Sequence, residues 1–171
     1  MQWIESFCDT FAKYLGVIIS FLLILMMVNV AFDTLNRYLM NSNSVALQEM
    51  EWHLFSVIIL LGTSYALSEE GHVRVDIFYT NFSAKKKAII NMIGVIIFVL
   101  PLSLLVAFGS LGFVEEAYIF MEQSGDPGGL PYRFIIKGLI PTSFFILIFM
   151  SVGYFARNYN LLKRLNSGSK S

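Results

Sequence analysis

The stretch from Ser44 to Asp76 constrains the fold most, because it places an apolar run between two clusters of ionisable and aromatic side chains. Residues 57–67 carry no charge. The flanking clusters are Glu49, Glu51, Trp52 and His53 before the run, and Glu69, Glu70, His72, Arg74 and Asp76 after it. A helix crosses a bilayer with about 20 mostly apolar residues, and charged and aromatic side chains gather at its ends. The pattern predicts a transmembrane helix over residues 46–68 with functional ends.

One face of this predicted helix is polar. At about 100° per residue, Trp52, His53, Ser56 and Thr63 lie within about 60° of Glu49 around the helix axis. Glu49 and His53 are one turn apart, so their side chains can share a proton or a charge. Ionisable residues in a membrane span mark functional sites, and three roles are open for this pair: structural or partner contact, solvation among headgroups, or a proton relay.

Composition places the whole chain in a bilayer. Hydrophobic residues make up 56% of the chain and charged residues 14%, against about 25% charged in soluble domains. The net charge is zero and no basic run is interleaved with aromatic residues, which excludes nucleic acid as a partner. Membrane lipids are the expected surroundings.

No cofactor is expected in this chain. One cysteine and two histidines cannot supply the four ligands of a structural zinc site. His53 and His72 lie about 28 Å apart along one helix and its exit, so they cannot ligate one haem iron. The single cysteine, Cys8, is instead expected to serve as a chemical probe of topology.

We expect an all-α integral membrane protein in which residues 1–171 form one membrane domain. Hydropathy predicts spans at about residues 14–40, 46–68, 88–114 and 138–160, and short interfacial helices at about 2–12 and 73–84. Ser44 is the expected N-cap of the second span. Pro101 predicts a kink in the third span, because proline removes a backbone donor within the helix.

The basic residues predict the orientation. Nine lie on one side of the predicted spans, namely Lys13, Arg74, Lys85, Lys86, Lys87, Arg157, Lys163, Arg164 and Lys170. Three lie on the other side, namely Arg37, Arg133 and Lys137. Because cytoplasmic loops carry the excess of basic residues, both termini should be cytoplasmic and the loop over residues 115–137 should face outward.

Two smaller features stand beside these spans. Asp33 and Arg37 are four residues apart at the end of the first span, which is typical of an ion pair that anchors a helix. The segment GDPGGLPYR, residues 125–133, holds three glycines and two prolines, which favours a defined turn. This turn either docks a partner or simply starts the fourth helix, with Pro131 near its first position.

Several of these motifs together resemble one family. LQEMEWHLF (residues 47–55), Gly62, HVRVD (residues 72–76) and GDPGGLPYRFIIKGLIP (residues 125–141) are similar to the DctQ-like small membrane subunit of tripartite ATP-independent periplasmic (TRAP) transporters. Within that family the chain resembles the branch labelled mannitol/chloroaromatic-type. The layout matches over nearly the whole chain.

The resemblance implies a non-catalytic, multi-pass subunit of the bacterial inner membrane. Its partners would be a large membrane subunit, which holds the substrate and sodium sites, and a periplasmic protein that delivers an organic acid. By family position, subunit contacts or structural roles are implied for Arg37, Glu49, Trp52, His72, Arg74, Asp76, Glu122, Gly129, Leu130, Pro131, Arg133, Lys137 and Pro141. His53 joins these candidates through its place one turn from Glu49.

The sequence leaves two other function classes to compare with this one. A small self-oligomerising, proton-coupled carrier could use Glu49 as its binding carboxylate, but Glu49 lies near a helix end and no second buried carboxylate is predicted to face it. The four predicted spans show no internal repeat and no pair of broken helices of the kind that forms transport sites. A membrane enzyme lacks a nucleophile and base pair or a metal cluster.

Overall fold

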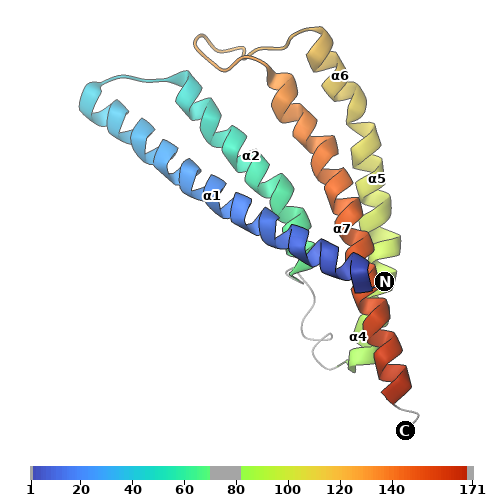
Figure 1. The fold of residues 1–171 in the computed structure, drawn as a ribbon. Helices are drawn as coiled ribbons and strands as arrows, with labels where there is room; N and C mark the ends of the chain where they lie inside the picture. Colours follow the sequence, from blue (N-terminus) through green and yellow to red (C-terminus); the bar gives the residue numbers. More distant parts are fainter. Residues whose placement is uncertain (1, 70–81, 169–171) are drawn as a thin grey trace.

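The computed structural model describes residues 2–69 and 82–168, and within these ranges every regular element is a helix (Figure 1). The elements are α1 (Gln2–Met40), α2 (Val45–Ser68), α4 (Ala84–Gly94), the π-helical turn η1 (Val95–Val99), α5 (Leu100–Gly109), α6 (Leu111–Ile119) and α7 (Arg133–Gly168). Four helical stretches are long and apolar enough to cross a membrane: Trp3–Met40, Val45–Ser68, Ala84–Ile119 and Arg133–Ser167. The prediction of an all-α protein with four spans is confirmed.

The arrangement has two parts that meet along α7. Helices α1 and α2 lie side by side as a hairpin, and α5 and α6 follow α7 on its other side (Figure 1). Helix α7 packs against α1, α2, α4, α5 and α6. Residues 41–44 and 120–132 connect helices at one end of the molecule, which we call the loop end, and the chain termini lie toward the opposite, terminal end.

The N-terminal helix differs from the expectation. Residues 2–12 do not form a separate interfacial helix, because α1 runs without a break from Gln2 to Met40. No proline interrupts this stretch, and Cys8, Ala12 and Leu15 are buried along it, so packing continues the helix. The other predicted interfacial segment covers residues 73–84. Its residues 73–81 lie outside the described part of the chain.

Cys8 is a poor topology probe, contrary to the expectation. Only 3% of its surface is exposed, and it belongs to an apolar core that also contains Ala12, Leu67 and Met150. A Cβ atom added at Gly153 would lie 2.4 Å from Cys8 Sγ, so glycine is needed there for α1 and α7 to approach closely. Burial of the thiol keeps reagents in water away from it.

The third span departs from regular α-helix just before Pro101. Residues Val95–Val99 form a π-helical turn, and the Leu100 N–H donates to the Val95 carbonyl. Pro101 has no N–H and its ring crowds the preceding turn, which favours such a local widening. The sequence predicted a kink near Pro101 and did not predict this π turn, which lies within a helical stretch longer than the predicted residues 88–114.

The boundaries of α7 shorten the predicted loop. Helix α6 ends at Ile119 and α7 begins at Arg133, so the connection covers residues 120–132 instead of 115–137. The fourth span correspondingly begins five residues before the predicted Gly138. Ser44 caps α2 as predicted, because its side chain accepts a hydrogen bond from the Leu47 N–H at 3.4 Å.

Much of the apolar surface faces outward. On α1 the large exposed side chains include Phe21, Ile24, Met27, Phe32 and Leu35. In water such a stripe would be costly, whereas lipid chains or a partner helix can cover it. The fold is therefore that of a membrane bundle with a small internal core.

Candidate functional site

Glu49 lies at the centre of the candidate site. It occupies the second turn of α2, close to the loop end, and only 5% of its surface is exposed. The chain covers it with the loop of residues 120–132, which reaches across from the end of α6 to the start of α7 (Figure 1). We call Glu49, Ser124, Gly129, Leu130 and Arg133 the Glu49 cluster.

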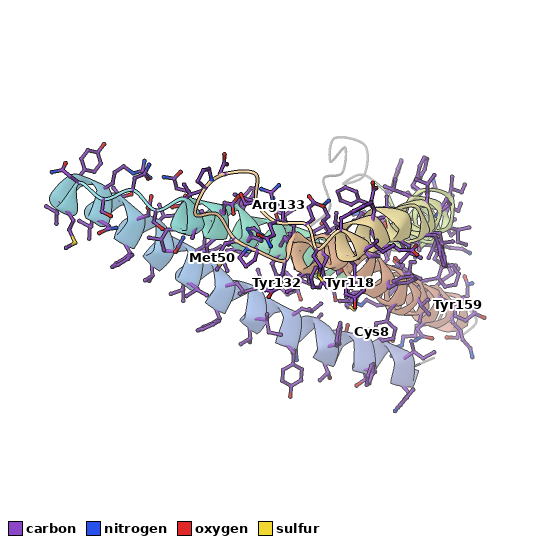
Figure 2. The ribbon with its side chains drawn as sticks, turned by 90° about the horizontal axis from the view of Figure 1, so that it is seen from above. Cys8, Met50, Tyr118, Tyr132, Arg133 and Tyr159 are labelled. Carbon is purple, nitrogen blue, oxygen red and sulfur yellow. The ribbon has the colours of Figure 1, made fainter. Side chains whose placement is uncertain are left out.

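Both carboxylate oxygens of Glu49 are hydrogen-bonded. Ser124 Oγ donates to Oε1 at 2.5 Å, and the Leu130 backbone N–H donates to Oε2 at 2.5 Å. Arg133 Nη2 donates to Oε1 at 3.0 Å, forming an ion pair across 84 positions of sequence. Seen from the loop end, Arg133 lies against α2 (Figure 2). A buried carboxylate with a cation and further donors is a stable arrangement, because its desolvation is compensated.

The glycine-rich loop has the defined shape that its sequence predicted. The Ser124 N–H donates to the Leu130 carbonyl at 3.2 Å, and the Gly129 N–H donates to the Asp126 carbonyl at 3.0 Å. Gly128 has a φ of +83°, which favours glycine. A Cβ atom at Gly129 would lie 2.3 Å from Ser124 Oγ and 2.8 Å from Glu49 Oε2. Gly129 thus permits the loop backbone to approach the carboxylate.

Pro131 lies just outside α7, two residues before its first position, Arg133. Tyr132, between them, has a positive φ of 62°, so the chain turns sharply here. Pro131 supplies no N–H, and the preceding Leu130 N–H goes to Glu49. The segment thus starts α7 and also closes the loop onto α2.

A second ion pair ties the two ends of the loop together. Lys137 pairs with Glu122, and its ammonium lies 3.8 Å from the centre of the Phe113 ring. The Arg133 N–H donates to the Glu122 carbonyl at 2.9 Å. The Arg133 guanidinium also lies 5.9 Å from the Trp52 ring centre. Glu122, Lys137 and Trp52 therefore lie next to the Glu49 cluster at the loop end.

His53 does not share a charge with the Glu49 carboxylate, contrary to one expectation. Its Nδ1 lies 2.6 Å from the Glu49 backbone oxygen, and its ring lies 3.9 Å from that of Trp52. The reason is that the loop already occupies both oxygens of the carboxylate. Ser56 and Thr63 likewise donate to carbonyls of their own helix, at 2.7 Å and 3.0 Å. The polar face of α2 is largely satisfied within α2 and by the loop.

The remaining predicted residues lie elsewhere. Arg37 pairs with Asp33 on α1, as their spacing predicted, and Asp33 is almost fully buried. Pro141 is buried within α7, two turns beyond Arg133. Among the described contacts, neither Arg37 nor Pro141 bonds to the Glu49 cluster. His72, Arg74 and Asp76 lie outside the described residues.

Sequence reasoning missed a second polar cluster at the terminal end, centred on Arg157. Arg157 Nη1 donates to the Ser68 carbonyl at the end of α2 at 2.9 Å, and Nη2 pairs with Asp9 of α1. Nearby, Asn160 Nδ2 donates to Glu5 Oε2 at 2.8 Å. The partners are as much as 155 positions apart, and no local pattern joins them. In the sequence, Arg157 stands out only as one of the nine basic residues on the predicted cytoplasmic side.

No metal centre is apparent in the part of the chain that the structure describes, since no three His, Cys, Asp or Glu side chains converge there. The arrangement at Glu49 fastens a loop to a helix. It presents no free carboxylate to a cavity, and the groups around it are hydrogen-bond donors that hold the carboxylate in place.

Comparison with known proteins finds a matching family. A search of curated proteins gave no match. Residues 26–161, which include α2, the loop and most of α7, match the family model described as "Tripartite ATP-independent periplasmic transporters, DctQ component". This match covers most of the chain, including every residue of the Glu49 cluster. The chain therefore belongs to the DctQ family, as a small inner-membrane component of a TRAP transporter and not as an enzyme.

Proposed function

We propose that this chain is a scaffold subunit that moves no substrate itself. In this proposal a large membrane subunit binds an organic acid together with sodium, and a periplasmic binding protein delivers the acid. The present chain packs against the static part of the large subunit and stabilises it. Family membership supports the assignment of this chain to a transporter. The following observations support its role as a scaffold.

The observation that carries the proposal is the state of the Glu49 carboxylate. A proton-coupled carrier needs a carboxylate that binds and releases its cargo during each cycle. Both oxygens of Glu49 are held by Ser124, Leu130 and Arg133, so releasing them would detach the loop from α2. This geometry favours a structural role over the carrier alternative.

The exposed apolar stripe of α1 supports packing against a larger partner. Its side chains, among them Phe21, Ile24 and Phe32, find little cover within the chain. Helices associate in bilayers by close packing of such surfaces. The large subunit is the partner that the family membership supplies.

The basic-residue bias supports an orientation with cytoplasmic termini and a periplasmic loop end. The loop of residues 120–132 would then face the compartment that holds the binding protein. Asp126 and Tyr132 are exposed on this loop, which suits a docking surface. We include docking of the binding protein in the proposed function.

The test is uptake into proteoliposomes driven by a sodium gradient. The chain reconstituted alone should take up no organic acid, and uptake should require the large subunit, the binding protein and sodium together. Uptake by this chain alone, or a Glu49→Gln complex that assembles normally but loses ion coupling, would favour the carrier.

Three variants test the docking role in the same assay. Asp126→Ala changes an exposed side chain, so uptake should fall at limiting binding protein and recover at saturation. Arg133→Ala breaks the anchor on Glu49, so uptake should fall at every concentration of binding protein. An Asp126→Ala variant, and a matching Tyr132→Ala variant, that titrate like the unmodified complex would remove docking from the proposal.

A further inference from the structure

Four large side chains are exposed at the two ends of the connection between α6 and α7. They are Tyr118, Phe120, Met121 and Tyr132, and each is more than half exposed. We call these four residues the loop-end platform. Clustered exposed apolar side chains mark interaction sites, and aromatic and methionine side chains are enriched where proteins bind one another. Of the four, the proposed function uses only Tyr132.

The platform is held in place by Phe134, the second residue of α7. The Tyr118 ring centre lies 5.3 Å from that of Phe134 and the Tyr132 ring centre lies 5.9 Å from it, both in edge-to-face geometry. Tyr118 and Tyr132 accordingly lie close together when the molecule is seen from above (Figure 2). Side chains that are fixed before a partner arrives lose less conformational entropy on binding.

Met121 occupies a backbone position that usually belongs to glycine. Its φ is +44°, just past the end of α6. The Glu122 N–H donates to the Ala117 carbonyl at 3.0 Å, and the Met121 N–H donates to the Tyr118 carbonyl at 3.1 Å. This is the Schellman pattern of a helix C-terminus, in which glycine is favoured because a Cβ is crowded at this φ. Methionine is therefore less stable here than glycine would be.

Tyr132 has the same cost, with a φ of +62°, which is unusual for a bulky residue. Asn41, at the end of α1, is the other non-glycine residue with a positive φ in the described ranges, and asparagine tolerates this conformation. Met121 and Tyr132 lack that local explanation, and both belong to the platform. Residues persist in strained conformations mainly where function requires their side chains.

The charges beside the platform favour a protein over lipid headgroups as its partner. Glu115 and Glu116 lie one turn before Tyr118 and Phe120, and Asp126 lies on the loop. All three carboxylates are exposed, and none has a cationic partner among the described residues. Neither α6 nor the loop contains a lysine or an arginine. Such a surface is repelled by anionic headgroups and attracts a protein surface that carries basic residues.

The position of the platform favours a soluble partner over a membrane neighbour. The end of α6 and the loop of residues 120–132 lie at the end of the molecule opposite the chain termini (Figure 1). A membrane neighbour packs along the sides of the helices, whereas a soluble protein can reach their ends. With the loop end in the periplasm, the soluble partner is the binding protein.

We propose that the loop-end platform is the hot spot on which the periplasmic binding protein docks. Phe120, Met121 and Tyr132 contact an apolar area of that protein, and basic residues around this area face Glu115 and Glu116. A few rigid aromatic or apolar side chains commonly carry most of the affinity of an interface. This inference rests on the docking role in the proposed function and names the residues that carry it.

The experiment measures the Kd of the binding protein, as purified from the periplasm, for the complex held in lipid nanodiscs. Met121→Gly removes the side chain and relieves the strained backbone. It should raise the Kd several-fold, while the melting temperature of the complex stays the same or rises. Met121→Leu keeps an apolar side chain at this position and should bind with nearly the unmodified Kd. Opposite effects on affinity and stability separate a contact residue from a structural one.

Further variants test the rest of the surface. Phe120→Ala should also raise the Kd several-fold. Asn41→Gly makes the matching change at the end of α1, where φ is +50°, and should leave the Kd unchanged. Glu115→Gln combined with Glu116→Gln should raise the Kd at low salt and have little effect at high salt, because salt screens exposed charges.

Several outcomes would overturn the proposal. Met121→Gly and Phe120→Ala complexes that bind like the unmodified complex would exclude the platform, and docking through the loop would stand alone if Asp126→Ala still weakened binding. An unmodified complex that does not bind the binding protein would remove docking from the proposed function as well. Loss of the large subunit from Met121→Gly complexes would place the platform in the subunit interface instead.

Discussion

Arg133 at the start of α7 and Glu49 in the second turn of α2 form an ion pair with 3.0 Å between Nη2 and Oε1. This contact joins the hairpin of α1 and α2 to the helices that follow it. The glycine-rich loop closes over the same carboxylate through Ser124 and Leu130. One side chain of α2 therefore bonds both to the start of α7 and to the loop between α6 and α7.

Replacing Glu49 by Gln should destabilise the assembled complex by about 1–3 kcal/mol, because charged hydrogen bonds are lost while shape is kept. The apparent melting temperature and the yield of the complex measure this effect. Glu51→Gln makes the same change on the same helix but outside the cluster and should have little effect. Equal losses from the two variants would show that the anchor does not stabilise the fold.

Replacing Gly129 by Ala should destabilise the loop, since the new Cβ would lie 2.3 Å from Ser124 Oγ. Such overpacking typically costs about 1–3 kcal/mol. Limited proteolysis within residues 120–132 should become faster. Gly125→Ala is the control, because a Cβ there meets no atom within 4 Å. If the two alanine variants are cleaved equally fast, the close approach at Gly129 is unimportant.

Arg157 should prove as important at the terminal end as Arg133 is at the loop end. Arg157→Gln loses the ion pair with Asp9 and the bond to the Ser68 carbonyl, whereas Asp9→Asn loses only the first. Arg157→Gln should therefore lower the melting temperature more. A double-mutant cycle should give a coupling of about 0.5–3 kcal/mol. Additive effects would mean that the pair contributes nothing.

Topology can be tested with cysteines at exposed sites, since Cys8 is buried. In a Cys8→Ala background, Asp126→Cys in the loop should react with a membrane-impermeant maleimide in intact spheroplasts. Ser167→Cys, near the end of α7, should react only in inverted vesicles. The opposite pattern would reverse the orientation that the basic residues predict.

The sequence by itself determined the number and approximate limits of the spans. Hydropathy is local, and in a bilayer every backbone group of a span must be bonded within its helix, so an apolar run of sufficient length becomes a helix. The same local rules located the Ser44 cap and the Asp33–Arg37 pair. Glycines and prolines likewise marked the loop.

Only the tertiary structure decided which of these features meet. The polar face of α2 singled out Glu49, and the four-residue spacing on the helix suggested His53 as its partner. The actual partners of the Glu49 carboxylate lie 75 to 84 positions away along the chain. The contacts of Arg157 with Ser68 and Asp9 had no local signal at all. Helical periodicity specifies the direction of a side chain on its own helix, whereas the packing of α1, α2 and α7 specifies what it touches.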